Sequence, residues 1–363
     1  MNKKKNTLID TKPNIIMMGS DLTVLGGVSE VVREYLKAGL DKKVNLVLVP
    51  SHIDGSKFQK LLKLIQAIKT FLFLPWEKKS IVHMHLSHGA SFFRKLLLMI
   101  IAKIKRQKVI MHLHGSDYEE FMHQSKLHTL LTKWVFDQSD HIIVLSKRWE
   151  NLLKNFTSNQ NITTLYNPAT QLSDTHHGQG NLKVLFLGRL GRRKGVYDLL
   201  DVITRDKHYY EERQVSFILA GDGETDEVLK RVKENTLEKI VDVPGWVSGA
   251  EKDAYLKNAH IFILPSYNEQ MPMSILEAMA HGYPILATDI AGIPEMVEQG
   301  ENGYLFSPGD LDAFEKYLKI LCEDEQLREK MGLKSKQIIN DKFDGHLITD
   351  KLVEIYGDVL NAS

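Results

Sequence analysis

Short apolar runs alternate with longer amphipathic stretches along most of the chain. Six runs in the first half are rich in Val and Ile and lack polar alternation: 14–18, 44–49, 80–85, 109–114, 141–145 and 162–165. Runs of this length indicate strands buried on both faces, and the stretches between them have helical spacing. Such repetition predicts a parallel sheet with right-handed crossovers. The first half is therefore expected to be a Rossmann-like α/β domain.

The same pattern begins again after a polar stretch. Further strands are predicted at 182–187, 215–220, 261–264 and 284–287, with helices at 196–204, 227–233 and 274–281 and a wholly helical region beyond Asp310. We therefore expect a domain at 1–170, a linker at 171–181, a second Rossmann-like domain at 182–343, and a final helix at 344–363 that can cross back to the first domain. Two doubly wound domains in tandem predict a cleft where the carboxyl ends of both sheets face a ligand.

Composition adds a charge asymmetry. The 363 residues are 43% apolar and 26% charged, with a net charge of +1. Residues 1–180 carry 25 basic and 14 acidic side chains, whereas residues 181–363 carry 22 and 32. The basic half suggests an anionic partner, which could be a lipid surface, a phosphorylated acceptor or nucleic acid.

The sequence indicates a cytoplasmic protein. Its single cysteine, Cys322, excludes an intrachain disulfide and indicates a reducing compartment. No apolar run reaches the length of a membrane span, since the longest, at 96–102, is bounded by basic residues on both sides. The basic N-terminus lacks the apolar segment of a signal peptide, so we expect the protein to stay where it is made.

Two features at strand ends could contact a ligand. Gly26 and Gly27 precede a helical pattern, and adjacent glycines at a helix start let backbone N–H groups approach a phosphate or sugar, although a tight turn explains them equally. Glu269 lies in a loop after a strand, and Glu277 lies about one turn inside a helix whose start Pro272 marks. These two carboxylates could bind two hydroxyl-bearing parts of one ligand, or be two unrelated exposed acids.

A glycine-rich basic loop follows the predicted strand at 182–187. It contains Gly188-Arg189 and Lys194-Gly195. Two cations at the carboxyl end of a strand could neutralise a diphosphate without a metal. A solvated basic turn is the alternative.

Together these motifs resemble the retaining nucleotide-sugar glycosyltransferases of family four, which have the GT-B fold. The resemblance covers nearly the whole chain. The matching features are E-x7-E at Glu269 and Glu277, G-R-x4-K-G from Gly188 to Gly195, the N-terminal glycine loop at Gly26-Gly27, and an active-site histidine at His114. The resemblance implies a GT-B fold with an acceptor-binding first domain and a donor-binding second domain.

The resemblance also implies roles for individual residues. The catalytic group would be His114, Glu269, Arg189 and Lys194. The donor would be bound by Gly26, Gly27, Gly188, Arg189, Lys194, Glu269, Met271, Pro272, Met273 and Glu277. Many members carry Gly-Phe-Gly after the first glutamate, whereas Gln270, Met271 and Pro272 follow here, so the donor sugar stays open.

The function implied is transfer of a hexose, with retention, from a nucleotide-diphosphate sugar to a glycan or lipid-linked acceptor in envelope or extracellular polysaccharide synthesis. UDP is favoured because it is the commoner donor base among similar proteins. No cofactor or metal is expected. The alternatives are a catalytically silent sugar-nucleotide-binding subunit and a GT-B epimerase or phosphorylase.

Two groups of residues have side chains that can bind metals. Histidines gather at two strand ends, but no cysteine or obvious acidic ligand completes a site; they are His83, His85, His88, His112 and His114. Asp310 and Asp312 have the D-x-D spacing of metal-dependent sugar transferases, yet they follow Pro-Gly and are better explained as a helix cap.

Lysines and large apolar residues are interleaved at 57–79 and again at 92–108. Such helices suit an anionic bilayer, although helices packed on their own sheet with solvated lysines would look similar. With the basic first half, we predict peripheral contact with the inner face of the cell membrane. No signature of nucleic-acid binding accompanies the charge, so none is predicted.

Overall fold

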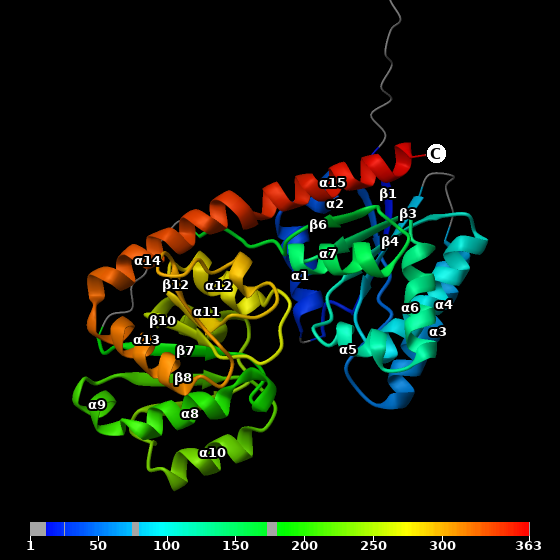
Figure 1. The fold of residues 1–363 in the computed structure, drawn as a ribbon. Helices are drawn as coiled ribbons and strands as arrows, with labels where there is room; N and C mark the ends of the chain where they lie inside the picture. The colour runs from blue at the N-terminus through cyan, green and yellow to red at the C-terminus, as the bar shows by residue number, and fades with distance from the viewer. Residues whose placement is uncertain (1–11, 25, 75–79, 173–179, 363) are drawn as a thin grey trace, which may run out of the picture.

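Two parallel sheets organise the chain. The structure is a computed structural model that describes residues 12–24, 26–74, 80–172 and 180–362. Each sheet has six strands, and all neighbouring strands run parallel. The predicted α/β class with two doubly wound halves is confirmed (Figure 1).

Ten of the twelve strands match the apolar runs of the sequence. The first sheet contains β1 (Asn14–Met18), β2 (Asn45–Leu48), β3 (Ser80–Leu86), β4 (Lys108–Leu113), β5 (His141–Val144) and β6 (Ile162–Thr164). The second contains β7 (Lys183–Leu187), β8 (Ser216–Ala220), β9 (Val241–Gly245), β10 (Ile261–Leu264), β11 (Ile285–Thr288) and β12 (Gly303–Phe306).

Helices cover both faces of each sheet. Those of the first half are α1 (Gly27–Lys37), α2 (Leu40–Lys43), α3 (Lys57–Phe73), α4 (Ala90–Ile104), α5 (Tyr118–His123), α6 (Lys126–Asp137) and α7 (Lys147–Phe156). Those of the second half are α8 (Val196–Arg205), α9 (Lys207–Glu212), α10 (Thr225–Glu234), α11 (Gly249–Asn258), α12 (Met273–Ala280), α13 (Leu311–Glu323), α14 (Glu325–Ile338) and α15 (Gly345–Asn361). Two short 3₁₀ turns, η1 (Arg192–Lys194) and η2 (Ile293–Glu295), and a π-helical segment, η3 (Ile339–Phe343), complete the elements.

Two strands were missing from the prediction, and both are edge strands. β9 contains Asp242 and Pro244 and is largely half-buried, and β12 is a short strand of four residues. Proline and polar residues are tolerated at an edge because one side of the strand has no ladder to satisfy. β9 therefore lacks a continuous apolar run, and the run in β12, Tyr304 to Phe306, is only three residues long.

The strand order fixes where ligands can bind. In the second sheet the order β12-β11-β10-β7-β8-β9 reverses direction between β7 and β10. In the first sheet, β2-β1-β3-β4-β5-β6, the reversal lies between β1 and β3. Loops leaving two such neighbours at their carboxyl ends separate and leave a crevice. Each sheet thus has one crevice.

The apolar core is not divided equally between the halves. One face of the first sheet packs against α3, α4, α5, α6 and α7. Its other face shares a continuous core with α1, α15 and the second half. The two halves are therefore joined by buried apolar contacts and not by the linker alone.

The last helix, α15, runs back over the first sheet (Figure 1). The hydroxyl of Tyr356 lies 2.6 Å from Nδ1 of His83 on β3. Lys43 Nζ lies 2.6 Å from the carboxylate of Asp350. The end of the chain thus contacts the half in which the chain began.

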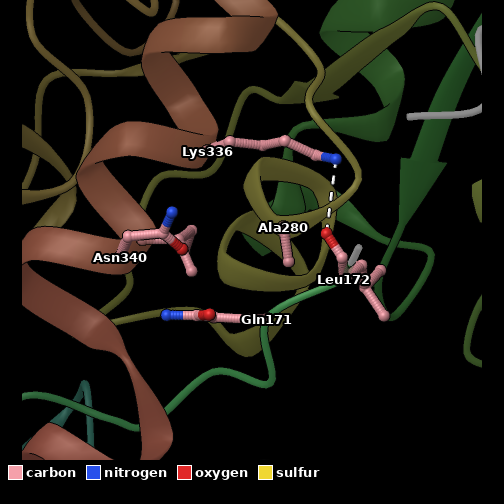
Figure 2. A pocket seen from close by; sticks show the side chains of 6 residues that line it. Gln171, Leu172, Ala280, Lys336 and Asn340 are labelled. Carbon is pink, nitrogen blue, oxygen red and sulfur yellow. Dashed lines mark hydrogen bonds between the residues drawn. The ribbon is translucent and has the colours of Figure 1, made fainter. Parts of the chain in front are cut away.

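A hollow of about 430 Å³ lies where the chain passes from the first half to the second. Figure 2 shows its wall, with Gln171 and Leu172 opposite Lys336 of α14 and Asn340 of η3. Lys336 Nζ donates to the carbonyl of Leu172 at 3.4 Å. Of the predicted linker, residues 173–179 lie outside the described residues.

Candidate active-site cleft

A cleft of about 900 Å³ lies between the two halves, and both contribute to its wall. The first half supplies Gly26 and Gly27 at the start of α1 and His114 after β4. The second half supplies the other residues predicted for the donor site: Gly188, Arg189, Lys194, Glu269, Met271, Pro272, Met273 and Glu277. The fold brings every predicted site residue to one cavity.

The crevice of the second sheet holds an ion pair. Lys194 Nζ donates to Glu269 Oε1 in a very short contact, and Ser266 Oγ donates to the same oxygen at 2.9 Å. The side chains of Lys194 and Glu269 are only 14% and 8% exposed. Within the described parts of the chain, no hydrogen bond or ion pair engages the exposed guanidinium of Arg189. Arg189 is thus available to bind an anion.

Close packing of two loops holds this ion pair in position. The loop after β7 forms η1 and ends at Gly195, whose φ is +70°. A Cβ on Gly195 would lie 1.9 Å from the carbonyl oxygen of Pro265, which follows β10. The carbonyl of Arg193 also accepts a hydrogen bond from Tyr267 N at 2.9 Å. Only glycine allows this approach of Lys194 to Glu269.

Glu277 on α12 has a cationic partner that sequence analysis missed. Lys252 Nζ of α11 lies 2.8 Å from Glu277 Oε1. Burial raises the pKa of Glu277, Lys252 opposes that rise, and the nearby Glu30 adds to it. The two residues lie on different helices and are 25 residues apart in sequence, so no local spacing marks the pair.

His114 belongs to a stack of four histidine rings from β3 and the end of β4. His85 Nδ1 lies 2.8 Å from His114 Nε2, and His83 Nε2 lies 3.1 Å from His112 Nδ1. Burial lowers the pKa of His114 to about 3 and that of His83 to about 3, and it keeps His85 and His112 neutral as well. A neutral imidazole offers one donor and one acceptor. His114 therefore faces the cleft uncharged.

Three of these rings are the strongest metal-ligand candidates among the described residues. Ring nitrogens of His83, His85 and His112 lie within 4.8 Å of one another, and all three side chains are buried. Hydrogen bonds to Tyr356 and His112 already occupy both nitrogens of His83. A metal bound by His83 would have to displace one of those partners.

Contacts across the cleft connect the loop after β10 to the first half. Gln270 Nε2 donates to the carbonyl of Gly115, and Asn268 Nδ2 donates to Asp117, both in short contacts. Asn167 Nδ2 donates to the carbonyl of Met271 at 2.9 Å. These contacts hold the loop that carries Glu269 against the loop that carries His114. Nothing in the sequence marks these contacts, because polar residues in loops are common.

The D-x-D spacing serves a local purpose, as predicted. Asp310 is the N-cap of α13, and its carboxylate accepts a hydrogen bond from Ala313 N at 3.0 Å. Asp312 forms an ion pair with Arg205 at 2.7 Å. Both acids are engaged within the second half and do not line the cleft.

One side of the first half exposes many large apolar side chains, here called the α3/α4/α6 face. They are Phe58, Leu61, Leu62, Ile65, Leu72 and Phe73 on α3, Phe93, Leu97, Ile100 and Ile104 on α4, and Leu127, Leu130 and Trp134 on α6. Only Ala67 and Phe71 of α3 are buried. Helices that merely packed on their own sheet would bury more. Trp76 of the predicted segment lies outside the described residues, and no described helix has the length and apolarity needed to span a bilayer.

Comparison with known proteins assigns the family. Residues 170–338 match the family described as glycosyl transferases group 1. This segment, most of the second half of the chain, belongs to the family. This glycosyltransferase is 27% identical over 296 residues to N-acetyl-alpha-D-glucosaminyl L-malate synthase of Bacillus anthracis, covering 78% of this chain and 76% of that protein.

A second relative and a solved structure extend the similarity. The amylovoran biosynthesis glycosyltransferase AmsK of Erwinia amylovora is 25% identical over 288 residues, covering 75% of this chain and 68% of the relative. The crystal structure of Anabaena HepE in complex with UDP superposes with a TM-score of 0.74 at 17% identity, covering 95% of this chain and 100% of that one. The glycosyltransferase thus has the GT-B fold along nearly its whole length.

Proposed function

We propose that this glycosyltransferase transfers a hexose, with retention of configuration, from a UDP-sugar to a glycan or lipid-linked acceptor in cell-envelope or extracellular polysaccharide synthesis. One observation carries the proposal: the cations, carboxylates and glycine loop of the donor motifs all line a single 900 Å³ cleft. The binding of UDP by HepE and the role of AmsK in amylovoran biosynthesis support the donor base and the biosynthetic context.

In this proposal the donor lies across the crevice of the second sheet. Arg189 and Lys194 bind the diphosphate, Glu277 accepts hydrogen bonds from the ribose hydroxyls, and Glu269 accepts them from the hexose. Backbone N–H groups at Gly26 and Gly27 approach the phosphate from the other wall, where the N-terminus of α1 favours negative charge. The neutral ring of His114 contacts the sugar from the first half.

The positions of Arg189 and Lys194 suit the departure of the nucleoside diphosphate. As the bond to the anomeric carbon breaks, negative charge develops on the leaving phosphate oxygen. Cations already fixed beside that oxygen lower the barrier without reorganising. The acceptor hydroxyl attacks the same face of the sugar, and the leaving phosphate takes up its proton. No metal is needed for this charge balance.

Nucleotide binding tests the donor site. We would measure the melting temperature with UDP and with GDP, each with and without a chelator, on the wild type and on Arg189→Ala. A ligand present at a hundredfold excess over its Kd stabilises the native state by about 2.7 kcal/mol. We expect a chelator-insensitive rise with UDP that Arg189→Ala loses. Arg192→Ala is the matched control because Arg192 is exposed in the same loop but does not line the cleft.

Turnover separates the enzyme from a silent sugar-nucleotide-binding subunit. Incubation with a UDP-hexose should release UDP, and Glu269→Gln should stop this release while keeping the wild-type melting temperature. UDP binding without any UDP release, in the presence of cell-envelope extract as acceptor source, would favour the silent subunit. If UDP does not raise the melting temperature at millimolar concentration, the donor assignment is wrong.

We further propose that the α3/α4/α6 face contacts an anionic bilayer at the cytoplasmic side of the membrane. Exposed lysines lie among its apolar side chains, including Lys57, Lys69, Lys105, Lys126 and Lys133. The three helices lie on the same side of the first sheet (Figure 1). Each lysine near an anionic surface contributes about 1 kcal/mol, and the apolar groups add burial in the interface.

Vesicle co-sedimentation tests this contact. The protein should pellet with vesicles containing phosphatidylglycerol and much less with vesicles of phosphatidylcholine alone. Phe73 and Phe58 are 84% and 68% exposed, so the double variant Phe58→Glu/Phe73→Glu should fold normally and lose binding. Leu333→Glu is the control, because Leu333 is 64% exposed on α14 in the other half. Equal pelleting of both variants would contradict membrane contact through this face.

A further inference from the structure

A second, smaller pocket of about 300 Å³ adjoins the cleft in the first half. It lies at the carboxyl ends of β1, β2 and β3, beside the crevice of the first sheet. The two cavities share Gly26, Gly27, Val28 and Ser87 in their walls. A group bound in the small pocket would therefore lie next to the loop proposed to contact the donor phosphate.

The wall of this pocket is cationic and contains a buried lysine. Lys95 of α4 is 2% exposed, and its Nζ donates to Ser51 Oγ at 2.5 Å. No carboxylate pairs with Lys95 in the described part of the chain. An ammonium has three N–H donors, so this hydrogen bond leaves donors unused. A lysine is almost never fully buried unless it is paired.

Three more nitrogen atoms in the same wall are buried without a hydrogen-bond partner. They are Arg94 Nε, His52 Nδ1 and His85 Nε2. Asp54 is the one acidic residue of this wall among the described residues. Arg94 Nε and the ammonium of Lys95 can only donate, and each imidazole nitrogen donates in the tautomer that carries its proton there. Leaving buried polar atoms without partners costs free energy, so the convergence of these groups on one cavity points to a ligand that supplies acceptors.

The charges in the wall repel one another in the absence of such a ligand. Burial, together with the charge of Arg94, lowers the pKa of Lys95 to about 7. Burial also lowers the pKa of Arg94, and burial with the charges of Arg94, Lys60 and Lys95 lowers that of His52 despite Asp54. An anion in the pocket would relieve both the repulsion and the cost of burial.

From this geometry we infer that the pocket around Lys95 and Arg94 binds an anionic group of the acceptor, a phosphate or carboxylate close to the hydroxyl that receives the sugar. The inference rests on the proposed function, which supplies the sugar-transfer reaction, and it adds the chemical class of the acceptor. The anion belongs either to a lipid headgroup or to a soluble acceptor. The pocket lies at a switch point of strand order, where parallel sheets bind ligands.

Titration calorimetry with inorganic phosphate tests the pocket on the full chain. The protein is first saturated with UDP, so that phosphate cannot occupy the donor site at Arg189. We expect one phosphate to bind per chain at millimolar concentration or below. Removing a charge-assisted hydrogen bond should weaken binding by about tenfold or more, both in Lys95→Met and in Arg94→Gln. Lys105→Met, a change at the exposed residue that caps the C-terminus of α4, should bind like the wild type.

Two results would overturn the inference. One is the absence of phosphate and malonate binding by the UDP-saturated wild type at millimolar concentration. The other is binding that neither Lys95→Met nor Arg94→Gln weakens, in variants whose melting temperature shows that they are folded. Malonate is used in a separate titration as a carboxylate probe. Binding of either phosphate or malonate that depends on Lys95 supports an anion pocket.

Vesicles distinguish the source of the anion. If a lipid headgroup enters the pocket, Lys95→Met should bind vesicles containing phosphatidic acid more weakly than the wild type does. If the acceptor is soluble, only binding of free phosphate or malonate should weaken. Failure of the proposed function would look different, because UDP would then not bind while phosphate binding at Lys95 persisted.

Discussion

Replacing Lys95 by methionine should stabilise the protein at neutral pH. The ordinary pKa of lysine is 10.5, and burial lowers that of Lys95 to about 7. Keeping this group partly charged in the folded state at pH 7 costs about 4 kcal/mol, because each tenfold change in proton affinity is about 1.4 kcal/mol. Loss of the hydrogen bond to Ser51 would offset about 1 kcal/mol of the gain. A net increase of about 3 kcal/mol in the free energy of unfolding is expected.

The stability difference between Lys95→Met and the wild type should depend on pH in a definite direction. Below pH 7 the lysine is charged in both states, so the full cost is present in the wild type. Between pH 7 and 10.5 only the unfolded chain holds the proton, so the cost falls as pH rises and vanishes above 10.5. The difference between Lys95→Met and the wild type should therefore be largest at acidic pH and shrink toward alkaline pH.

Urea unfolding followed by circular dichroism measures this difference in buffers free of phosphate. Lys105 is the exposed C-cap residue of α4, and Lys105→Met should match the wild type at every pH. A Lys95→Met protein that is no more stable than the wild type at pH 7 would refute the reasoning. So would a stability difference that does not change between neutral and alkaline pH. Either result would mean that Lys95 is not a buried, unpaired charge.

Three further substitutions follow from the site. Gly195→Ala would put a Cβ 1.9 Å from a carbonyl oxygen of the loop after β10 at a φ of +70°, so we expect a lower melting temperature and loss of the UDP-induced shift. Lys252→Met removes the cation that keeps the pKa of Glu277 from rising further. Calorimetry should show that UDP binding is weakened by about tenfold at pH 7, and by more at lower pH, where Glu277 takes up a proton. An unchanged affinity would contradict the role of this ion pair. Tyr356→Phe leaves a buried nitrogen of His83 without its 2.6 Å partner, so urea unfolding should show a loss of about 1–3 kcal/mol, and wild-type stability would mean that this bond contributes nothing.

The sequence predicted the interior of the fold well and its edges poorly. Central strands such as β1 and β10 are continuous apolar runs, and their bounds match the prediction. The edge strand β9 carries Asp242 and Pro244, so it has no such run. The hydrophobic pattern of a sequence reflects which residues are buried, and an edge strand is only partly buried.

The α4 segment shows where pattern misleads. The mixture of lysines and aromatics at 92–108 suggested a helix face exposed to a membrane. Several apolar side chains of α4 are indeed exposed, but Phe92 and Lys95 are buried on its other side. One helix thus carries both the exposed apolar face and a wall of the cationic pocket. Residue type and spacing did not distinguish the buried lysine from its exposed neighbours.

The sequence by itself determined the α/β class, the repeated doubly wound halves and the strand-end motifs, because each depends on residues near one another in the chain. Only the tertiary structure decided which charges meet. The pairing of Glu277 with Lys252, the contact of Lys194 with Glu269, and the burial of Lys95 away from any described carboxylate all depend on how separate elements pack. Local periodicity specifies an element and its buried face, whereas the partner of a charged side chain depends on crossovers and packing between elements distant in sequence.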